Sequence, residues 1–218
     1  MRRWPTCGNG SARWTTPTRS VTGRRCDFVV AGAGKRSDLS VRVGGRELAV
    51  SHHPRIRRLH DEIFLRPPFV FAERASEEHE NMLTSIREDP TFGISVALCG
   101  ADLVGFTYGH RLPVDHQWWE RFTVLLPAGV AEEWEGRTFA LIDIGVSEKW
   151  RGKGVGRCLM DSLLGPRGER RAILSVQPSA VRAHAFYERL GWQLIGRKGP
   201  IPGVLPPFWD IYCHPLSA

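Results

Sequence analysis

The sequence lacks any apolar run long enough to cross a bilayer, and its first residues lack the continuous apolar core of a secretory signal. Its five cysteines are scattered without a CxxC pair, which argues against a disulfide framework and against a zinc site. The eight histidines form no HExxH pattern, and the adjacent His52 and His53 would point apart in an extended segment. These absences predict a soluble, cytoplasmic protein with no metal and no membrane association.

Acidic residues are also in short supply. The chain has 30 Lys and Arg against 23 Asp and Glu, which gives a formal charge of +7. Such an excess is typical of nucleic-acid-binding proteins, but much of it lies within residues 1–40, and no basic groove with interleaved aromatic residues is visible. We therefore expect that nucleic acid is not the main partner.

Residues 1–40 are rich in Arg, Gly, Thr and Ser, which predicts a disordered tail ahead of one domain over residues 41–218. A transit-like segment, or a start codon placed too far upstream, would have the same composition. The tail ends in VVAGAGKRS (29–37), which resembles a phosphate-binding loop. A Walker A loop needs Ser or Thr directly after its lysine, and Arg36 stands there, so we interpret this match as coincidental.

The first half of the domain shows two helices and a hairpin. Apolar residues recur at helical spacing over 56–64, and a second helix is expected to begin with Ser76 as its N-cap. Two strand-like runs, 92–99 and 103–110, flank a short turn and predict an antiparallel hairpin. A long connection over 113–137 follows.

The second half alternates strands with helices. The pattern predicts helices over 155–164 and 180–190, and strands over 139–146, 172–176, 192–196 and 208–212. The whole order predicts an α+β fold, in which a mixed, largely antiparallel sheet is flanked by helices.

The strongest chemical signal is a glycine-rich basic loop between a predicted strand and an amphipathic helix. Its residues are Arg151, Gly152, Lys153, Gly154, Val155, Gly156 and Arg157. Glycines let the backbone approach a ligand closely, and the unpaired N–H groups of a first helical turn bind anions. The three basic side chains would add charge where a pyrophosphate sits. A plain surface turn is the alternative, and the strand–loop–helix order argues against it.

This loop resembles the acetyl-CoA-binding motif of the GNAT superfamily of N-acetyltransferases, written Arg/Gln-x-x-Gly-x-Gly/Ala. Arg151, Gly154 and Gly156 meet it. A second block, AHAFYERLGW over 183–192, resembles the family's late helix with its Tyr-Glu-x-x-Gly-aromatic pattern. Because both blocks stand in the family's order, the resemblance covers about residues 139–192. It implies a GNAT-like fold with a splayed central strand pair.

The resemblance implies acetyl transfer from acetyl-CoA to a primary amine by direct attack in a ternary complex. The pantetheine arm would bond to the backbone of Ile144, Gly145 and Val146, where an amide would also stabilise the oxyanion. Tyr187 matches the tyrosine that protonates the departing thiolate; the alternative is an aromatic residue that only packs. Tyr187→Phe is expected to lower turnover more than cofactor affinity.

Asp143 is the only ionisable residue within the apolar strand over 139–146. It would accept a proton from the incoming ammonium or bind it electrostatically, and pairing with an Arg or Lys of a neighbouring strand stays an equal alternative. One position departs from the family pattern. Ala180 stands where the late helix often begins with a cofactor-binding Asn, so Ser179 or Gln177 would have to supply that bond.

The acceptor side is predicted from aromatic residues in two connections, 113–137 and 199–207, which commonly border the acceptor pocket in this family. A wall around an organic amine would be formed by Trp118, Trp119 and Trp209, with Trp134 and Phe208 nearby. Glu132, Glu133 and Glu135 would attract the cation. Ordinary packing of these tryptophans in a long loop is the alternative.

Three functions remain open from the sequence. A small-molecule amine acetyltransferase leads, and a protein lysine or N-terminal acetyltransferase is the nearest alternative. A non-catalytic acyl-CoA-binding module belongs to a different class. Assembly as a homodimer is compatible with each of them.

Overall fold

The computed structural model describes residues 39–216 of the 218, so the predicted tail lies outside them except for its last two residues. The strands are β1 (Leu39–Gly44), β2 (Gly93–Cys99), β3 (Asp102–Arg111), β4 (Thr138–Val146), β5 (Arg171–Val176), β6 (Gln193–Lys198) and β7 (Trp209–Pro215). The helices are α1 (Arg46–Phe64), α2 (Ala75–Ile86), α3 (Val155–Leu164) and α4 (Val181–Arg189), with 3-10 turns at Gln117–Trp119 and Glu148–Trp150.

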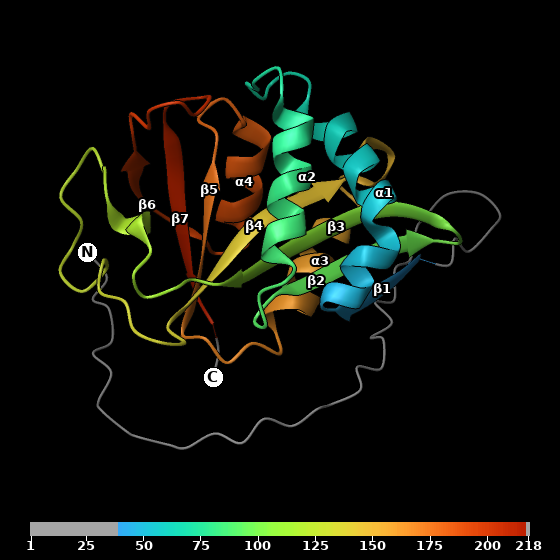
Figure 1. Ribbon diagram of the computed structural model, residues 1–218, viewed down its shortest axis with the longest axis horizontal. Helices are drawn as coiled ribbons and strands as arrows, with labels where there is room; N and C mark the ends of the chain where they lie inside the picture. The colour runs from blue at the N-terminus through green and yellow to red at the C-terminus, as the bar shows by residue number, and fades with distance from the viewer. Residues whose placement is uncertain (1–38, 217–218) are drawn as a thin grey trace.

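The strands form one sheet in the order β1-β2-β3-β4-β5-β7-β6, with helices on both faces (Figure 1). Only β4 and β5 are parallel; every other neighbouring pair is antiparallel. The mixed, largely antiparallel sheet that the sequence predicts is therefore confirmed.

Each face of the sheet is covered by one pair of helices. On one face, α1 and α2 bury Ile56 and Leu83 against Phe106 of β3. On the other, α3 and α4 bury Leu163 and Tyr187 against β4, β5 and β7. Burying a side chain of this size stabilises the fold by about 1.5–3 kcal/mol, so both pairs are firmly attached. The sheet therefore separates α1 and α2 from α3 and α4.

Two helix starts differ from the sequence prediction. The first helix begins at Arg46, well before the predicted stripe, and runs through Pro54, because Ala49 and His52 of its first turns are buried. The second begins at Ala75, so Ser76 lies inside it and is not its N-cap. The Ser76 hydroxyl instead donates to a carboxylate oxygen of Asp61 at 2.7 Å and ties α2 to α1.

A β-bulge interrupts the pairing of β3 with β4. Tyr108 pairs with Asp143 and Gly109 with Leu141, which leaves Ile142 as an extra residue. The Thr107 hydroxyl donates to the backbone carbonyl of Asp143 at 2.8 Å and fixes the strand just past the bulge. Bulges of this kind re-aim the following side chains, and here the residue concerned is Asp143.

Gly109 makes this bulge possible, and its replacement by Ala is expected to destabilise the fold. An added Cβ would collide with the carbonyl oxygen of Ala140 and lie 2.8 Å from Phe139 Cε1. Overpacking against backbone costs about 1–3 kcal/mol, so the urea midpoint of Gly109→Ala should fall at an unchanged m-value. Gly168→Ala is the control, since nothing lies within 4 Å of its added Cβ. Equal midpoints for both variants would contradict this role.

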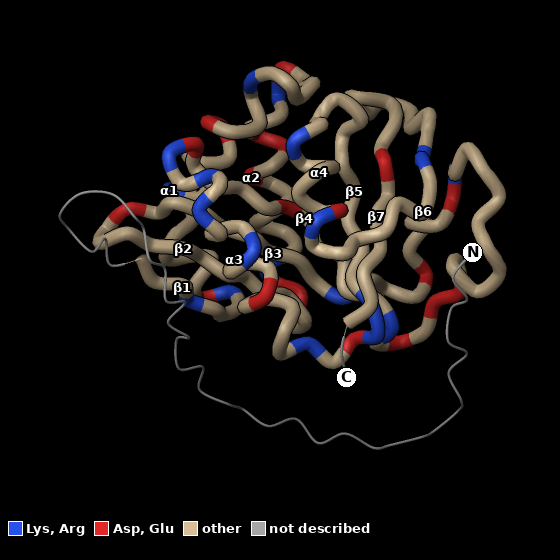
Figure 2. Tube along the Cα trace, turned by 180° about the vertical axis from the view of Figure 1, so that it is seen from behind, with Lys and Arg blue, Asp and Glu red and all other residues tan. Residues whose placement is uncertain are grey.

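Acidic and basic residues are interspersed over the described chain. In the view from behind, Lys and Arg alternate with Asp and Glu, and no single basic stripe follows the sheet (Figure 2). None of the helices over residues 39–216 combines the length and apolarity needed to span a bilayer.

Candidate active site

The centre of the sheet opens between its two parallel strands. Residues 138–140 of β4 pair with 171–173 of β5, and the pairing stops there. The strands nevertheless continue to Val146 and Val176. Backbone N–H and C=O groups that face this gap therefore have no strand partner across it, and they are available to a ligand. The predicted splayed strand pair is confirmed.

A helix N-terminus stands at the end of β4. Gly152 and Gly154 adopt positive φ angles of 72° and 81°, and α3 begins directly after them. The first intrahelical bond runs from the Cys158 N–H to the Gly154 carbonyl at 3.0 Å, so the amides of residues 155–157 precede it. Such amides, at the positive end of a helix dipole, bind phosphate groups.

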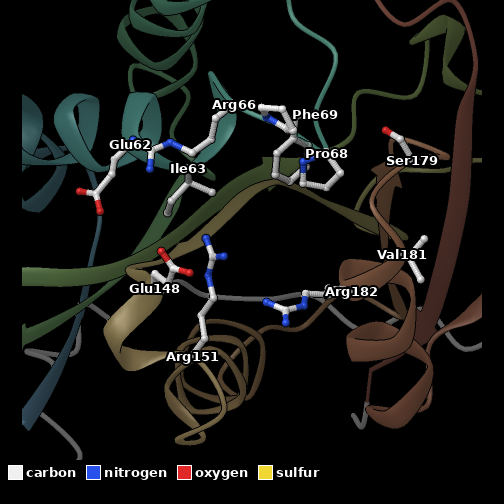
Figure 3. Close-up of a pocket in the computed structure, with 11 residues that line it drawn as sticks. Glu62, Ile63, Arg66, Pro68, Phe69, Glu148, Arg151, Ser179, Val181 and Arg182 are labelled. Atoms are coloured by element: carbon white, nitrogen blue, oxygen red, sulfur yellow. The ribbon is translucent and has the colours of Figure 1, made fainter.

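A cavity of about 460 Å³ adjoins this loop, and arginines approach it from two walls (Figure 3). Arg66 extends from the end of α1, whereas Arg151 and Arg182 lie on the opposite wall. Within residues 39–216, none of the three has a carboxylate at ion-pair distance. Arg151 donates through Nε to the Val146 carbonyl at 3.0 Å, which anchors the loop to the end of β4. Glu62 and Glu148 also line the cavity, so three arginines and two carboxylates leave a formal excess of one positive charge facing an anion.

The other two basic residues of the loop lie away from the cavity lining. Lys153 Nζ sits 5.1 Å from the centre of the Trp150 ring. Arg157 Nε lies 3.6 Å from Asp161, one helical turn on, and both side chains are exposed. Of the three predicted charges, Arg151 alone lines the cavity.

Gly145 is a glycine because of packing. An added Cβ would lie 2.8 Å from Phe106 Cε1 and 2.9 Å from Ile63 Cδ1, on the α1 face of the sheet. Its neighbours Ile144 and Val146 pack against the opposite face, in the core built on α3 and α4. The three predicted backbone contacts therefore lie on the unpaired end of β4.

Tyr187 lies on α4, in the core between that helix and the sheet. It is 6% exposed and packs edge-on against Trp192 with ring centres 5.8 Å apart. Its hydroxyl makes no hydrogen bond with any residue of 39–216, so its proton is available. Burial, and then the charge of Asp143, raise the pKa of Tyr187 well above its usual value. The phenol therefore stays protonated at neutral pH.

Asp143 lies on the α1–α2 face of the sheet, and its side chain is 18% exposed. The Tyr108 hydroxyl donates to its Oδ2 at 2.5 Å, and His79 Nε2 lies 3.6 Å from the same oxygen. No Lys or Arg of the described chain pairs with it, so the predicted alternative of a strand–strand ion pair is wrong. The charge of Asp143 contributes to the raised pKa of Tyr187, so the two predicted catalytic groups act on each other although they lie on opposite faces of the sheet.

The sequence profile of the acetyltransferase (GNAT) family matches residues 55–192. The chain belongs to the GNAT acetyltransferase family. A comparison with curated protein sequences finds no match. Enzymes of this family transfer an acetyl group from acetyl-CoA to an amine, and this protein has their fold.

Solved structures agree on the GNAT fold. An acetyltransferase from Thermus thermophilus is 18% identical and covers 82% of this chain and 97% of its own, with a TM-score of 0.53. Arabidopsis thaliana NAA60 in complex with acetyl-CoA is 14% identical, covers 83% and 99%, and has a TM-score of 0.58. The ribosomal-protein-S18-alanine N-acetyltransferase of Escherichia coli is 15% identical, covers 82% and 95%, and has a TM-score of 0.55.

One residue expected to replace the missing GNAT asparagine is already engaged. The Gln177 side chain accepts from the Val70 N–H at 2.7 Å and donates to the Val70 carbonyl at 2.9 Å. It therefore ties the α1–α2 connection to the end of β5, and both of its side-chain polar atoms are already engaged there. Ser179 is exposed and lines the cavity, while Ala180 is buried as the N-cap of α4.

Two of the tryptophans predicted to form an acceptor wall, Trp118 and Trp119, make cation–π contacts with Lys and Arg side chains of the protein itself. The Arg171 guanidinium lies 4.5 Å above the Trp119 ring, and the Trp119 indole donates to Glu133 at 3.1 Å. Lys198 lies 5.6 Å from the Trp118 ring and donates to the Trp118 carbonyl at 2.6 Å. Trp209 starts β7 opposite Lys198, at the open end of the gap. These contacts hold the long connection on the sheet.

Glu133 and Glu135 both form ion pairs with arginines of the protein itself. Glu133 is almost fully buried, pairs with Arg171 at 3.2 Å and accepts from Thr138 at 2.9 Å. Glu135 pairs with Arg111 at 2.8 Å. The predicted attraction of a cation is therefore wrong for Glu133, whose charge is paired inside the protein with Arg171. Glu135 stays exposed, and for this residue the expectation remains a prediction.

Four site residues escaped sequence reasoning: Arg66, Arg182, His79 and Tyr108. None belongs to a motif, because only folding places the two arginines at the cavity and the other two residues beside Asp143. His60, His79 and Asp143 offer ligand atoms within 4.8 Å of one another. However, the rings of His60 and His79 stack at 3.5 Å with planes only 10° apart, so no ion can lie in both planes at bonding distance. The group does not fit a metal.

Proposed function

We propose that this GNAT acetyltransferase binds acetyl-CoA in the gap between β4 and β5 and acetylates a primary amine on a small molecule. The observation that carries the proposal is the unpaired end of β4, which leads into a helix N-terminus beside an arginine-lined cavity. The backbone of residues 144–146 would hold the pantetheine arm, and the amides of 155–157 the pyrophosphate. Arg66, Arg151 and Arg182 add charge for the phosphates.

Two side chains would manage the protons. Asp143 takes the first proton from the bound ammonium, so that the nitrogen lone pair attacks the thioester carbon directly. As the carbon–sulfur bond breaks, Tyr187 donates its proton to the thiolate and regains one from the new amide nitrogen. Of the two protons that the nitrogen loses, one ends on the thiol and one leaves through Asp143 to solvent.

The edge of the sheet supports a small acceptor. Polypeptides commonly bind by adding a strand to an open edge. On β6 that edge is partly covered, because the Thr123 N–H donates to the Arg197 carbonyl and the Gly199 N–H to the Arg121 carbonyl, both at 2.8 Å. NAA60 and the S18-alanine enzyme share only the fold with this chain, so protein acetylation is the alternative that the assay must test.

Acetyl-CoA is expected to stabilise the protein against heat through the arginine-lined cavity. Ligand at a hundred times its dissociation constant contributes about 2.7 kcal/mol, or about 5 to 11 °C at this chain length. A variant carrying Arg151→Ala and Arg182→Ala should lose most of that shift. The matched control carries Arg58→Ala and Arg189→Ala, two exposed arginines outside the cavity lining, and should keep it. Equal shifts in both variants would refute this placement.

Release of free CoA thiol, measured against a panel of acceptors, tests the reaction. The panel contains small primary amines, diamines and aminoglycosides beside a peptide with a free N-terminus and a blocked peptide with an internal lysine. Turnover with small amines supports the proposal, whereas turnover with peptides alone replaces it by protein acetylation. A thermal shift without turnover on any acceptor would favour a non-catalytic acyl-CoA-binding module.

A further inference from the structure

Beside Asp143, a chain of buried polar side chains crosses from α2 to β4. His79 and Tyr108 are 5% and 0% exposed, and no sequence motif marks either residue. His79 Nε2 lies 2.9 Å from the Tyr108 hydroxyl, which in turn lies 2.5 Å from Asp143 Oδ2. Burying a polar group costs free energy unless the group is hydrogen-bonded. This row of buried polar side chains therefore calls for a function or for a network that satisfies it.

The direction of each hydrogen bond follows from chemistry. An ionised carboxylate only accepts, so the Tyr108 hydroxyl must donate to Asp143. That hydroxyl has one proton, so it must accept from His79, whose proton is then on Nε2. Burial lowers the pKa of His79 to about 4, outweighing the nearby charge of Asp143, so the ring is neutral at pH 7. His79 Nδ1 is left as a buried atom with no partner among the described residues.

Neighbouring groups fix His79 in this state. Its ring stacks on His60 at 3.5 Å, and His60 Nδ1 lies 3.2 Å from Asp61. Asp61 also accepts from Ser76, on the same helix as His79. The rotation of His79 is thus set by contacts of α1 and α2 together.

The two oxygens of Asp143 consequently differ. Oδ2 is occupied by Tyr108, whereas Oδ1 accepts no hydrogen bond from residues 39–216. Oδ1 also has access to solvent, because it is not among the buried unpartnered atoms of the structure. A carboxylate pinned through one oxygen cannot rotate freely, and its other oxygen keeps a fixed direction.

We propose that His79 and Tyr108 are positioning residues, which hold Asp143 through Oδ2 and direct Oδ1 at the ammonium group of the acceptor. This inference rests on the proposed role of Asp143 as proton acceptor. Tyr108 acts through Asp143, and His79 acts through Tyr108. Neither touches the substrate.

The test compares an acceptor that must lose a proton with one that need not. A primary alkylamine is almost fully protonated at pH 7, whereas methoxyamine is largely neutral there. The readout is the ratio of kcat/KM for the best alkylamine of the panel to that for methoxyamine. A merely structural lesion lowers both rates and leaves the ratio unchanged, whereas a misdirected Asp143 lowers the ratio.

Tyr108→Phe should lower this ratio about tenfold or more, as expected for losing a hydrogen bond to a charged group. His79→Leu should lower it several-fold, and His79→Gln, which retains a donor near Nε2, should restore much of it. Tyr212→Phe is the matched control, since its buried hydroxyl bonds to His184 and Glu188 and not to Asp143. Thermal unfolding and acetyl-CoA affinity verify that each variant is folded.

The variant Asp143→Asn distinguishes the role of Asp143 as proton acceptor from the positioning role of His79 and Tyr108. A low ratio in Asp143→Asn with a wild-type ratio in Tyr108→Phe would overturn the positioning role and keep Asp143 as proton acceptor. A wild-type ratio in Asp143→Asn would overturn the role of Asp143, and the positioning role with it. A ratio for Tyr212→Phe as low as that for Tyr108→Phe would also overturn the inference, because the loss would then be general.

Discussion

Replacing Tyr187 by Phe should lower kcat by about a hundredfold or more and leave acetyl-CoA affinity within about twofold. General acid catalysis contributes about 10²–10⁴ in rate, and Phe removes the only proton that this side chain can give. The ring packs against Trp192 and Phe186, and Phe preserves those contacts. Because the hydroxyl bonds to no described residue, its loss breaks no structural hydrogen bond.

The measurement is a comparison of kcat, from thiol release, with the dissociation constant of acetyl-CoA, from calorimetry. Tyr212→Phe again serves as control, because it also removes one hydroxyl from a buried tyrosine, but a hydroxyl that is engaged with His184 and Glu188. Wild-type turnover in Tyr187→Phe would remove this residue from the mechanism. A large loss of affinity would instead assign it to cofactor binding.

Replacing Asp143 by Asn should lower kcat/KM for an alkylamine by about a hundredfold at pH 7, and the loss should shrink as pH rises. Without a proton acceptor, the variant uses only the amine that is already neutral. That fraction grows about tenfold per pH unit until the amine titrates near pH 10. Wild type and variant should therefore converge at high pH.

The neighbours of Asp143 do not obscure this profile. The pKa of His79 is lowered to about 4, chiefly by burial. Burial, and then the charge of Asp143 with its hydrogen bond, raise the pKa of Tyr108 well above its usual value. Rates measured between pH 6 and 10 with two alkylamines of different basicity test the assignment. Parallel profiles for wild type and Asp143→Asn would exclude Asp143 as the proton acceptor.

The parts of the site that are local in sequence could be predicted. The strand over 138–146, the glycine loop and α3 follow one another directly in the sequence. The spacing of apolar residues and the positions of the glycines were therefore sufficient to predict them. Tyr187 lies in a second contiguous block, and the family resemblance implies its role, which stays a prediction. The hairpin of β2 and β3 was equally local, because a short turn joins its two apolar runs.

The parts that depend on packing could not be predicted. Tyr108 and Asp143 are 35 residues apart, and His79 is 29 residues before Tyr108, so no spacing rule connects them. The first half of α1 was missed because Pro54 normally ends a helix, and only burial against the sheet shows that this helix continues. The sequence predicted that Glu133 attracts the cationic acceptor, because its partner Arg171 lies 38 residues away and no spacing rule connects the two.

The hydrogen bonds between Val70 and Gln177 also imply that the gap between β4 and β5 forms as the protein folds. The gap divides the sheet into β1–β4 on one side and β5–β7 on the other. At one end, the two parts are joined by the three-residue pairing of β4 with β5. At the other end they are joined through the α1–α2 connection, by the two bonds to Gln177. Contacts within the chain thus connect the two sides of the gap at both of its ends. The free energy needed to separate β4 from β5 is supplied by folding. A ligand that binds in the gap therefore has little reorganisation of the protein to drive.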